Sequence, residues 1–190
     1  MKRVAVSLAA IAALVFAAGA SAHVVVSPPV AVAKELQQFT LSVPTEEENA
    51  TTTKIELTVP SGFAIDSFEP ASDGWQQQVK STGSGEEAIV QTVTWTGGKV
   101  PTGQDSVFRF NASTSGSKTY VFRVRQTYSD GKVVDWSGPE SSDTPAPRVK
   151  AVSSLGGGGT STLAIVALIL GAVALVVAVA GLAGRSRPVA

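Results

Sequence analysis

The sequence predicts an all-β fold, an antiparallel β-sandwich, followed by a flexible linker and one C-terminal transmembrane helix. Three observations predict this organisation. Residues 23–150 carry short runs in which β-branched and aromatic residues alternate with polar ones, and no comparable helical periodicity appears there. Residues 156–159 are consecutive glycines, which are typical of a flexible tether. Residues 163–182 carry no charge, and their length is that of a transmembrane helix.

The expected strands follow one another at short intervals along residues 23–150. They are residues 23–27, 37–43, 52–59, 64–68, 75–80, 88–96, 107–112, 119–128 and 133–136. Residues 129–131, Ser-Asp-Gly, predict a hairpin turn because glycine accepts the positive φ needed there. This number and spacing of strands favour an immunoglobulin-like arrangement.

The N-terminus has the three marks of a secretory signal peptide. Lys2 and Arg3 give a positive start, residues 4–17 are apolar, and Ala-Ser-Ala at 20–22 is a cleavage site. The predicted cut falls directly before His23. The alternative is an uncleaved N-terminal anchor, but the apolar run is short for a membrane span.

The predicted organisation is therefore a signal peptide (1–22), a sandwich domain (23–150), a linker (151–162), a transmembrane helix (163–184) and a tail (185–190). Arg185 and Arg187 follow the span, and basic residues beside a span favour the cytoplasmic side. We expect a single-pass protein of the cell membrane, with the N-terminal domain extracytoplasmic and the C-terminus cytoplasmic.

Composition narrows the range of partners. The chain has no cysteine, so no disulfide supports the domain. Without Lys2, Arg3, Arg185 and Arg187, 11 basic and 15 acidic side chains remain. This acidic balance argues against a nucleic-acid partner and mildly favours attraction of cations.

Catalysis finds little support in the sequence. His23 is the only histidine and cysteine is absent, which excludes Cys-His and two-histidine sites. A Ser-His-Asp triad would need His23 as its base, and no G-x-S-x-G elbow accompanies it. No P-loop or dinucleotide fingerprint appears either. We therefore predict a protein that is not an enzyme.

His23 instead favours metal chemistry. After cleavage it would be the first residue, so its α-amino nitrogen and ring Nδ1 could both bind one ion and lose their protons to it. Such nitrogen donors, completed by carboxylate or water, suit Cu(II). The single methionine, Met1, leaves with the signal peptide, so the soft ligands that Cu(I) prefers are missing. The other interpretation is an ordinary exposed terminus.

Several motifs in order resemble those of the YcnI-like copper-binding proteins of bacteria. They are AHVVVSP at 22–28, FTLSVPTE at 39–46, ATTTKI at 50–55, DGKVVDWSG at 130–138 and DTPAP at 143–147. A C-terminal membrane anchor after a low-complexity linker is also usual in that family. The resemblance implies a sandwich domain that binds Cu(II) through a brace with one histidine.

The resemblance assigns the ligands residue by residue. It implies that His23 supplies amine and imidazole nitrogens and that Glu46 supplies a carboxylate oxygen. Glu46 begins a run of three glutamates, which in isolation is more typical of a solvated loop. Glu47 and Glu48 remain alternatives if the register differs.

The family's tryptophan near the metal corresponds best to Trp136, as a neighbour rather than a strong ligand. Trp75 and Trp95 compete with it, and Trp95 has the pattern of a core residue. Some relatives carry a histidine after the proline of the closing motif, where this chain reads Thr-Pro-Ala-Pro at 144–147. That departure leaves His23 as the only imidazole.

These features predict a membrane-anchored extracytoplasmic Cu(II)-binding protein for copper capture, trafficking or homeostasis. The resemblance implies a copper-transport membrane protein or a copper chaperone as partner. One alternative is an adhesion or envelope-structural sandwich without metal. A copper-dependent oxidase is the other, but the oxidases that use an N-terminal histidine employ a second histidine, which this chain lacks.

Overall fold

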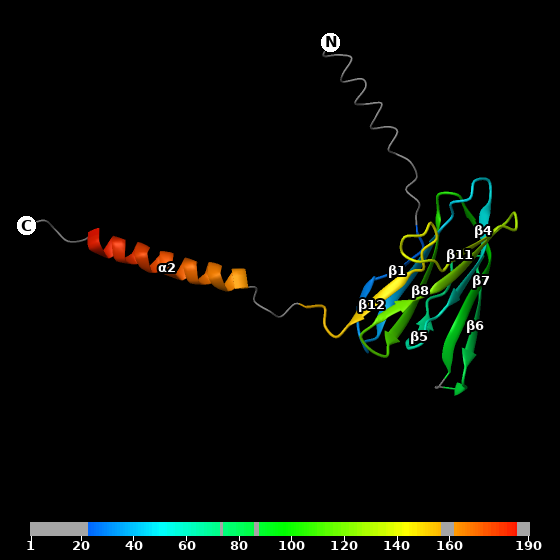
Figure 1. Cartoon of the computed structure of the whole chain (residues 1–190), viewed down its shortest axis with the longest axis horizontal. Helices are drawn as coiled ribbons and strands as arrows, with labels where there is room; N and C mark the ends of the chain where they lie inside the picture. Colours follow the sequence, from blue (N-terminus) through cyan, green and yellow to red (C-terminus); the bar gives the residue numbers. More distant parts are fainter. Residues whose placement is uncertain (1–22, 73, 86–87, 157–161, 186–190) are drawn as a thin grey trace, which may run out of the picture. The chain divides into compact units, whose positions relative to one another are not determined.

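The computed structural model describes residues 23–72, 74–85, 88–156 and 162–185, which Figure 1 draws in colour. The predicted signal peptide (1–22) lies outside the described residues, as do 157–161 of the predicted linker and 186–190 of the predicted tail. The chain forms two compact units that divide at Gly156. The domain boundaries predicted above stay predictions.

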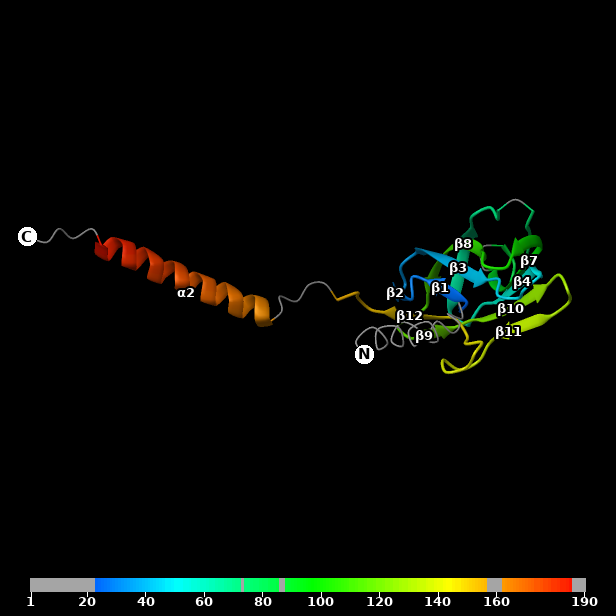
Figure 2. The same cartoon turned by 90° about the horizontal axis from the view of Figure 1, so that it is seen from above.

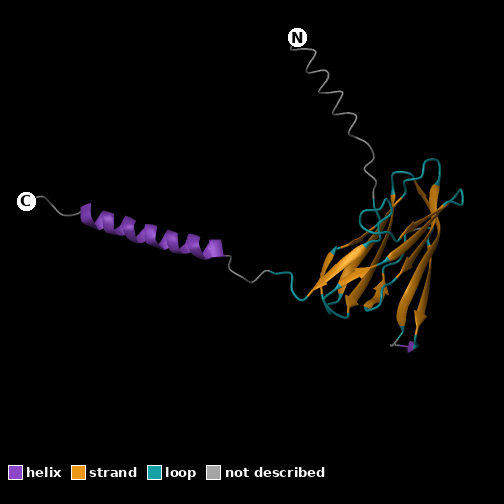
Figure 3. Ribbon diagram, in the orientation of Figure 1, coloured by secondary structure: helices purple, strands orange, loops and turns teal. Residues whose placement is uncertain are grey.

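The first unit is an all-β sandwich, in which Figure 3 shows that strands predominate. One large sheet has the order β1 (Val25–Ser27), β3 (Gln37–Pro44), β8 (Asp105–Thr114), β5 (Phe63–Phe68). The other has the order β11 (Val133–Trp136), β10 (Arg123–Tyr128), β4 (Thr51–Thr58), β7 (Ile89–Pro101), β6 (Gln76–Thr82). Figure 1 shows these sheets as two layers.

A small third sheet has the order β2 (Val30–Val32), β12 (Arg148–Val152), β9 (Thr119–Val121). Its strands lie together beside β1 in Figure 2. The paired strands described in the two large sheets are antiparallel, whereas β12 pairs with β2 in parallel. The predicted antiparallel sandwich is thus confirmed.

The core forms because alternate residues of each strand point inward. Phe39, Leu41 and Val43 of β3 are at most 1% exposed, as their alternation predicts. Phe63 packs edge-on against Phe39 and Phe122, with ring centroids 5.1 and 4.8 Å away. Aromatic pairs at these separations add stabilisation beyond the area that they bury.

Two strands of the structure are not among those expected from the sequence. Val30–Val32 and Arg148–Val152 become β2 and β12 because they pair with each other from distant parts of the chain. Neither run has a hairpin partner next to it in the sequence, so no local signal predicts the pairing.

The strand predicted at 119–128 is two strands, β9 and β10. The break falls at Phe122, whose N–H donates to the Pro147 carbonyl at 2.9 Å. On one side of this break β9 pairs with β12, and on the other β10 pairs with β4 and β11. The chain changes sheets here, and alternation alone does not reveal such a change.

The predicted turn after β10 is confirmed. Gly131 has φ of 88° and its N–H donates to the Tyr128 carbonyl at 3.1 Å. Asp130 Oδ1 accepts from the Lys132 N–H at 2.9 Å and supports the turn. β10 and β11 are therefore a tight hairpin with Trp136 opposite Val124.

The described residues of the second unit form the helix α2 (Thr162–Arg185) after Gly156. Its segment 164–181 has a mean hydropathy of 2.9, and the described side chains within that segment are exposed. The helix is long and apolar enough to cross a membrane.

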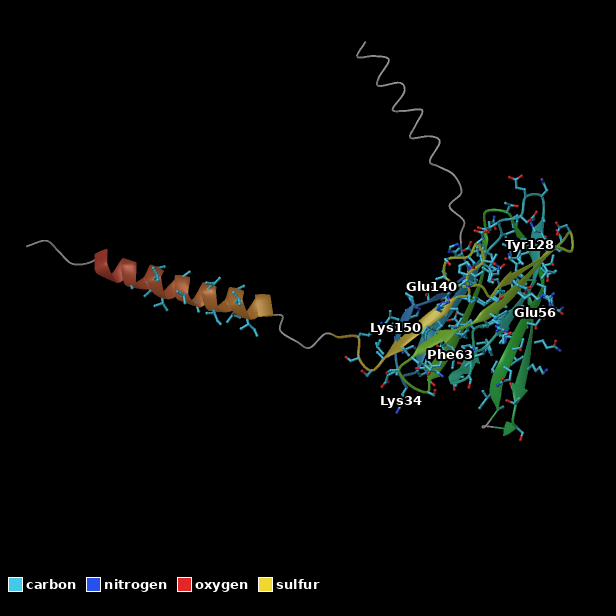
Figure 4. All side chains as sticks on the ribbon, viewed as in Figure 1. Lys34, Glu56, Phe63, Tyr128, Glu140 and Lys150 are labelled. Atoms are coloured by element: carbon cyan, nitrogen blue, oxygen red, sulfur yellow. The ribbon has the colours of Figure 1, made fainter. Side chains whose placement is uncertain are left out.

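The described chain enters the sandwich at one end and leaves it at the other. Continued past the start of β1, the β1–β3 register brings His23 opposite Pro44, the last residue of β3. At the other end Val152, the last residue of β12, accepts a hydrogen bond from the Ala33 N–H. In Figure 4 Tyr128 lies at one end, and Lys34 and Lys150 lie toward the other. The chain therefore leaves the sandwich far from His23.

We expect the Tyr120→Phe substitution to lower the free energy of unfolding of this domain by about 1 kcal/mol. The Tyr120 hydroxyl donates to the Gly116 carbonyl at 3.0 Å and accepts from the Gly116 N–H at 3.2 Å. Phenylalanine would fill the same space without these hydrogen bonds. Urea unfolding of the two proteins measures the difference, and an unchanged midpoint would contradict the expectation.

Candidate metal centre

His23 lies at the entrance to β1 and its side chain is exposed. The next residue, Val24, is 2% exposed and packs into the core, so it holds the chain against the sandwich directly after His23. His23, the residues of β1 and the segment 145–148 line a groove of about 340 Å³. The imidazole is thus accessible while its backbone is anchored.

The backbone nitrogen of His23 is an amide in the full chain, because Ala22 precedes it. An amide nitrogen becomes an amine donor only when the bond between residues 22 and 23 is cut. The two-nitrogen chelate predicted above therefore depends on that processing step.

Of the three tryptophans in the chain, Trp136 contacts the His23 ring. The ring centroids are 6.5 Å apart and the ring planes meet at 63°, an edge-to-face arrangement. Trp136 is 1% exposed, and Trp75 and Trp95 both pack on Phe108. The prediction that Trp95 is a core residue agrees with its 1% exposure.

Glu46 follows the end of β3 and is exposed, whereas Thr45 just before it is 2% exposed. Two backbone hydrogen bonds fix Thr45: its N–H donates to Gln104 at 3.0 Å, and its carbonyl accepts from Gly103 at 2.9 Å. The strand end that carries Glu46 is therefore fixed, at the end of the sandwich where His23 enters.

Tyr128 lies beneath this strand end. Burial raises the pKa of the Tyr128 hydroxyl, the backbone N–H of Glu46 opposes that rise by donating to it, and the carboxylates of Glu46 and Glu47 raise it further. The phenol therefore stays protonated at neutral pH.

The neighbouring glutamates have different surroundings. Glu47 forms an ion pair with Lys132, and this hydrogen bond raises the pKa of the lysine above its ordinary value. Glu48 is exposed in the turn after β3. The first two glutamates of the run thus have different contacts: the Glu47 carboxylate pairs with Lys132 in the β10–β11 turn, and the Glu46 backbone hydrogen-bonds the Tyr128 hydroxyl.

Among the residues that the structure describes, no three side chains of histidine, cysteine, aspartate or glutamate cluster as a metal cage. A metal held here would need donors besides side chains. One imidazole, one backbone amine after processing, and one carboxylate form such a set, and it suits a tetragonal Cu(II) centre completed by water. The residues at this end of the sandwich fit that ion.

Gln126 is a further residue of this region that no sequence motif indicated. It is 0% exposed, and its side-chain Oε1 accepts from the Trp136 indole N–H at 3.0 Å. A signal was present: Gln126 alternates in phase with Val124 and Tyr128, so its position in the strand is an inward one. A polar residue at an inward position needs partners inside the protein.

Fold and site together define an immunoglobulin-like sandwich protein with a candidate metal centre that has a single imidazole. The chain belongs to the family described as "Domain of unknown function (DUF1775)", which matches residues 23–152. This match and a copper-binding relative together confirm the predicted membership of the YcnI-like copper-binding proteins.

The chain is similar to the copper-binding protein CutI of Bacillus subtilis (strain 168). The two are 33% identical over 192 residues, which are 92% of this chain and 91% of the relative. The sandwich also resembles the crystal structure of a protein from Nocardia farcinica with an immunoglobulin-like fold. That structure is 31% identical with a TM-score of 0.58, over 68% of this chain and 98% of the other.

Proposed function

We propose that this chain is a membrane-anchored, extracytoplasmic Cu(II)-binding protein that captures copper for trafficking or homeostasis. The observation that carries the proposal is that Gln126 hydrogen-bonds both to Trp136, whose ring meets that of His23, and to Pro44, two residues before Glu46. The likeness to a copper-binding relative over nearly its whole length supports the choice of metal.

In the proposed site His23 binds copper through its ring and, once processed, through its α-amine. Glu46 supplies the carboxylate oxygen. The family resemblance assigns this role to Glu46, whereas Glu47 forms an ion pair with Lys132. Trp136 shields one side of the His23 ring and is not itself a strong ligand.

The proposed oxidation state follows from the donor set. The chain has no cysteine, and its one methionine is the first residue of the predicted signal peptide. Nitrogen and carboxylate oxygen donors favour Cu(II) over Cu(I). A site with this ligand set holds and releases an ion, and we propose no turnover for it.

The apolar helix α2 supports a single-pass anchor, with the sandwich on the extracytoplasmic side. The tether leaves the sandwich at Val152, at the end opposite His23. The metal centre is therefore exposed to solvent and to partners at the end of the domain away from the tether. A copper-transport membrane protein or a copper chaperone would receive or deliver the ion there.

Copper titration of the processed protein, with N-terminal sequencing of the same sample, tests the proposal. We expect a chain that begins at His23, one equivalent of Cu(II) bound, and an electron paramagnetic resonance spectrum with nitrogen hyperfine coupling. A mature chain that begins at another residue would end the proposal of a brace. Absence of stoichiometric Cu(II) binding would end the proposal of function.

A further inference from the structure

A chain of buried hydrogen bonds connects the two large sheets at the end that carries the candidate metal centre. Gln126 lies on β10 of the five-stranded sheet. Its Nε2 donates to the carbonyl of Pro44, on β3 of the four-stranded sheet, at 2.8 Å. This hydrogen bond crosses the interior of the sandwich.

The Gln126 side-chain amide makes three hydrogen bonds in this chain, with both Nε2 donors and with Oε1. Nε2 also donates to Thr52 Oγ1 at 2.8 Å, and Oε1 accepts from the Trp136 indole N–H at 3.0 Å. Thr52 continues the chain to Thr45, with their hydroxyl oxygens 2.7 Å apart. Buried polar networks whose members are all satisfied fix their neighbours in one arrangement.

The two ends of this chain are the two parts of the candidate centre. One end is Trp136, whose ring meets that of His23. The other end is Pro44 and Thr45, the last residues before Glu46. His23 lies just before β1 and Glu46 just after β3, two strands of one sheet, whereas Trp136 ends β11 of the other. Their spacing therefore depends on how the two sheets are held together.

We propose that Gln126 is a positioning residue of the metal centre: it fixes the Trp136 ring and the Glu46 strand end relative to each other without touching the ion. This inference rests on the proposed function, since it assigns a role toward the metal. Substitution of a residue that orients the ligands of a metal lowers the affinity for the metal, even though that residue does not bind the metal itself.

The test measures Cu(II) affinity of the processed protein and its Gln126→Leu variant, at a temperature where both are folded by circular dichroism. We expect about a tenfold weaker affinity for the variant, with altered copper hyperfine coupling. Tyr120→Phe is the matched control. It too loses hydrogen bonds, but their partner is Gly116, in the turn between β8 and β9, close to the Lys34–Thr114 hydrogen bond at the end of the sandwich opposite His23.

Two further variants keep the test decisive if Gln126→Leu does not fold. Trp136→Phe keeps an aromatic ring and removes the N–H that donates to Gln126. Thr52→Val removes the hydroxyl that links Gln126 to Thr45. Each is expected to weaken Cu(II) binding severalfold more than Tyr120→Phe does.

The outcomes separate this inference from the proposed function. If the wild-type protein binds Cu(II) through His23 while the Gln126, Trp136 and Thr52 variants match the Tyr120→Phe control in affinity and spectrum, the inference is overturned and the function stands. If the wild-type protein binds no Cu(II), or His23→Ala leaves binding unchanged, the proposed function itself fails.

Discussion

Replacing His23 by alanine in the processed protein will weaken Cu(II) binding by about 10²–10⁴-fold, which is the gain in affinity that two linked donors have over one. In the proposed site the imidazole and the amine of one residue close a chelate ring, so removal of the ring nitrogen leaves a single weak donor at the terminus. Competition with a chelator of known affinity measures the loss. Unchanged stoichiometry and affinity in His23→Ala would place the copper elsewhere.

The matched control for His23→Ala is a processed protein that retains Ala22. This protein keeps the imidazole, while its amine moves to the preceding residue. Its affinity should fall about tenfold or more, and its electron paramagnetic resonance spectrum should show a different set of nitrogen donors. Identical spectra with and without Ala22 would show that the amine of His23 is not a donor, whatever the effect of His23→Ala.

The sequence predicts the antiparallel strands of the sandwich well because their signal is local. In residues 37–43 every second side chain is apolar, and those side chains, Phe39, Leu41 and Val43, are buried. The β2–β12 pair was beyond prediction, because short strands far apart in the chain depend on tertiary contacts rather than on their own pattern.

For the candidate site, the sequence indicates which residues to consider but not how they are held. A lone histidine after a cleavage motif draws attention to His23, and the family motifs add Glu46 and Trp136. The contact between Trp136 and His23 depends on the β10–β11 hairpin and on where β1 enters the sandwich, which are properties of the fold. Gln126 was missed because Pro44 and Thr52, two of its three partners, come from β3 and β4, which lie far from β10 in the sequence.

Substitution in the run of glutamates at 46–48 should also cause a large loss of Cu(II) affinity. Glu46→Gln should weaken Cu(II) binding by about 10–100-fold, since it removes an anionic oxygen donor but keeps the shape of the side chain. The backbone N–H of residue 46 can still donate to the Tyr128 hydroxyl, so the strand end should keep its position. Isothermal titration of the processed variant, with its thermal unfolding as a check on the fold, measures the change.

Glu47→Gln and Glu48→Gln are the charge-matched controls, because each removes one negative charge from the same loop. Glu47→Gln breaks the ion pair with Lys132, which is partly exposed and of a kind that contributes little to stability. If the loop acted only through its overall charge, all three variants would weaken binding to the same small extent. A loss of Cu(II) affinity confined to Glu46→Gln would identify Glu46 as the carboxylate ligand. A larger loss of affinity in either control would identify Glu47 or Glu48 as the ligand instead.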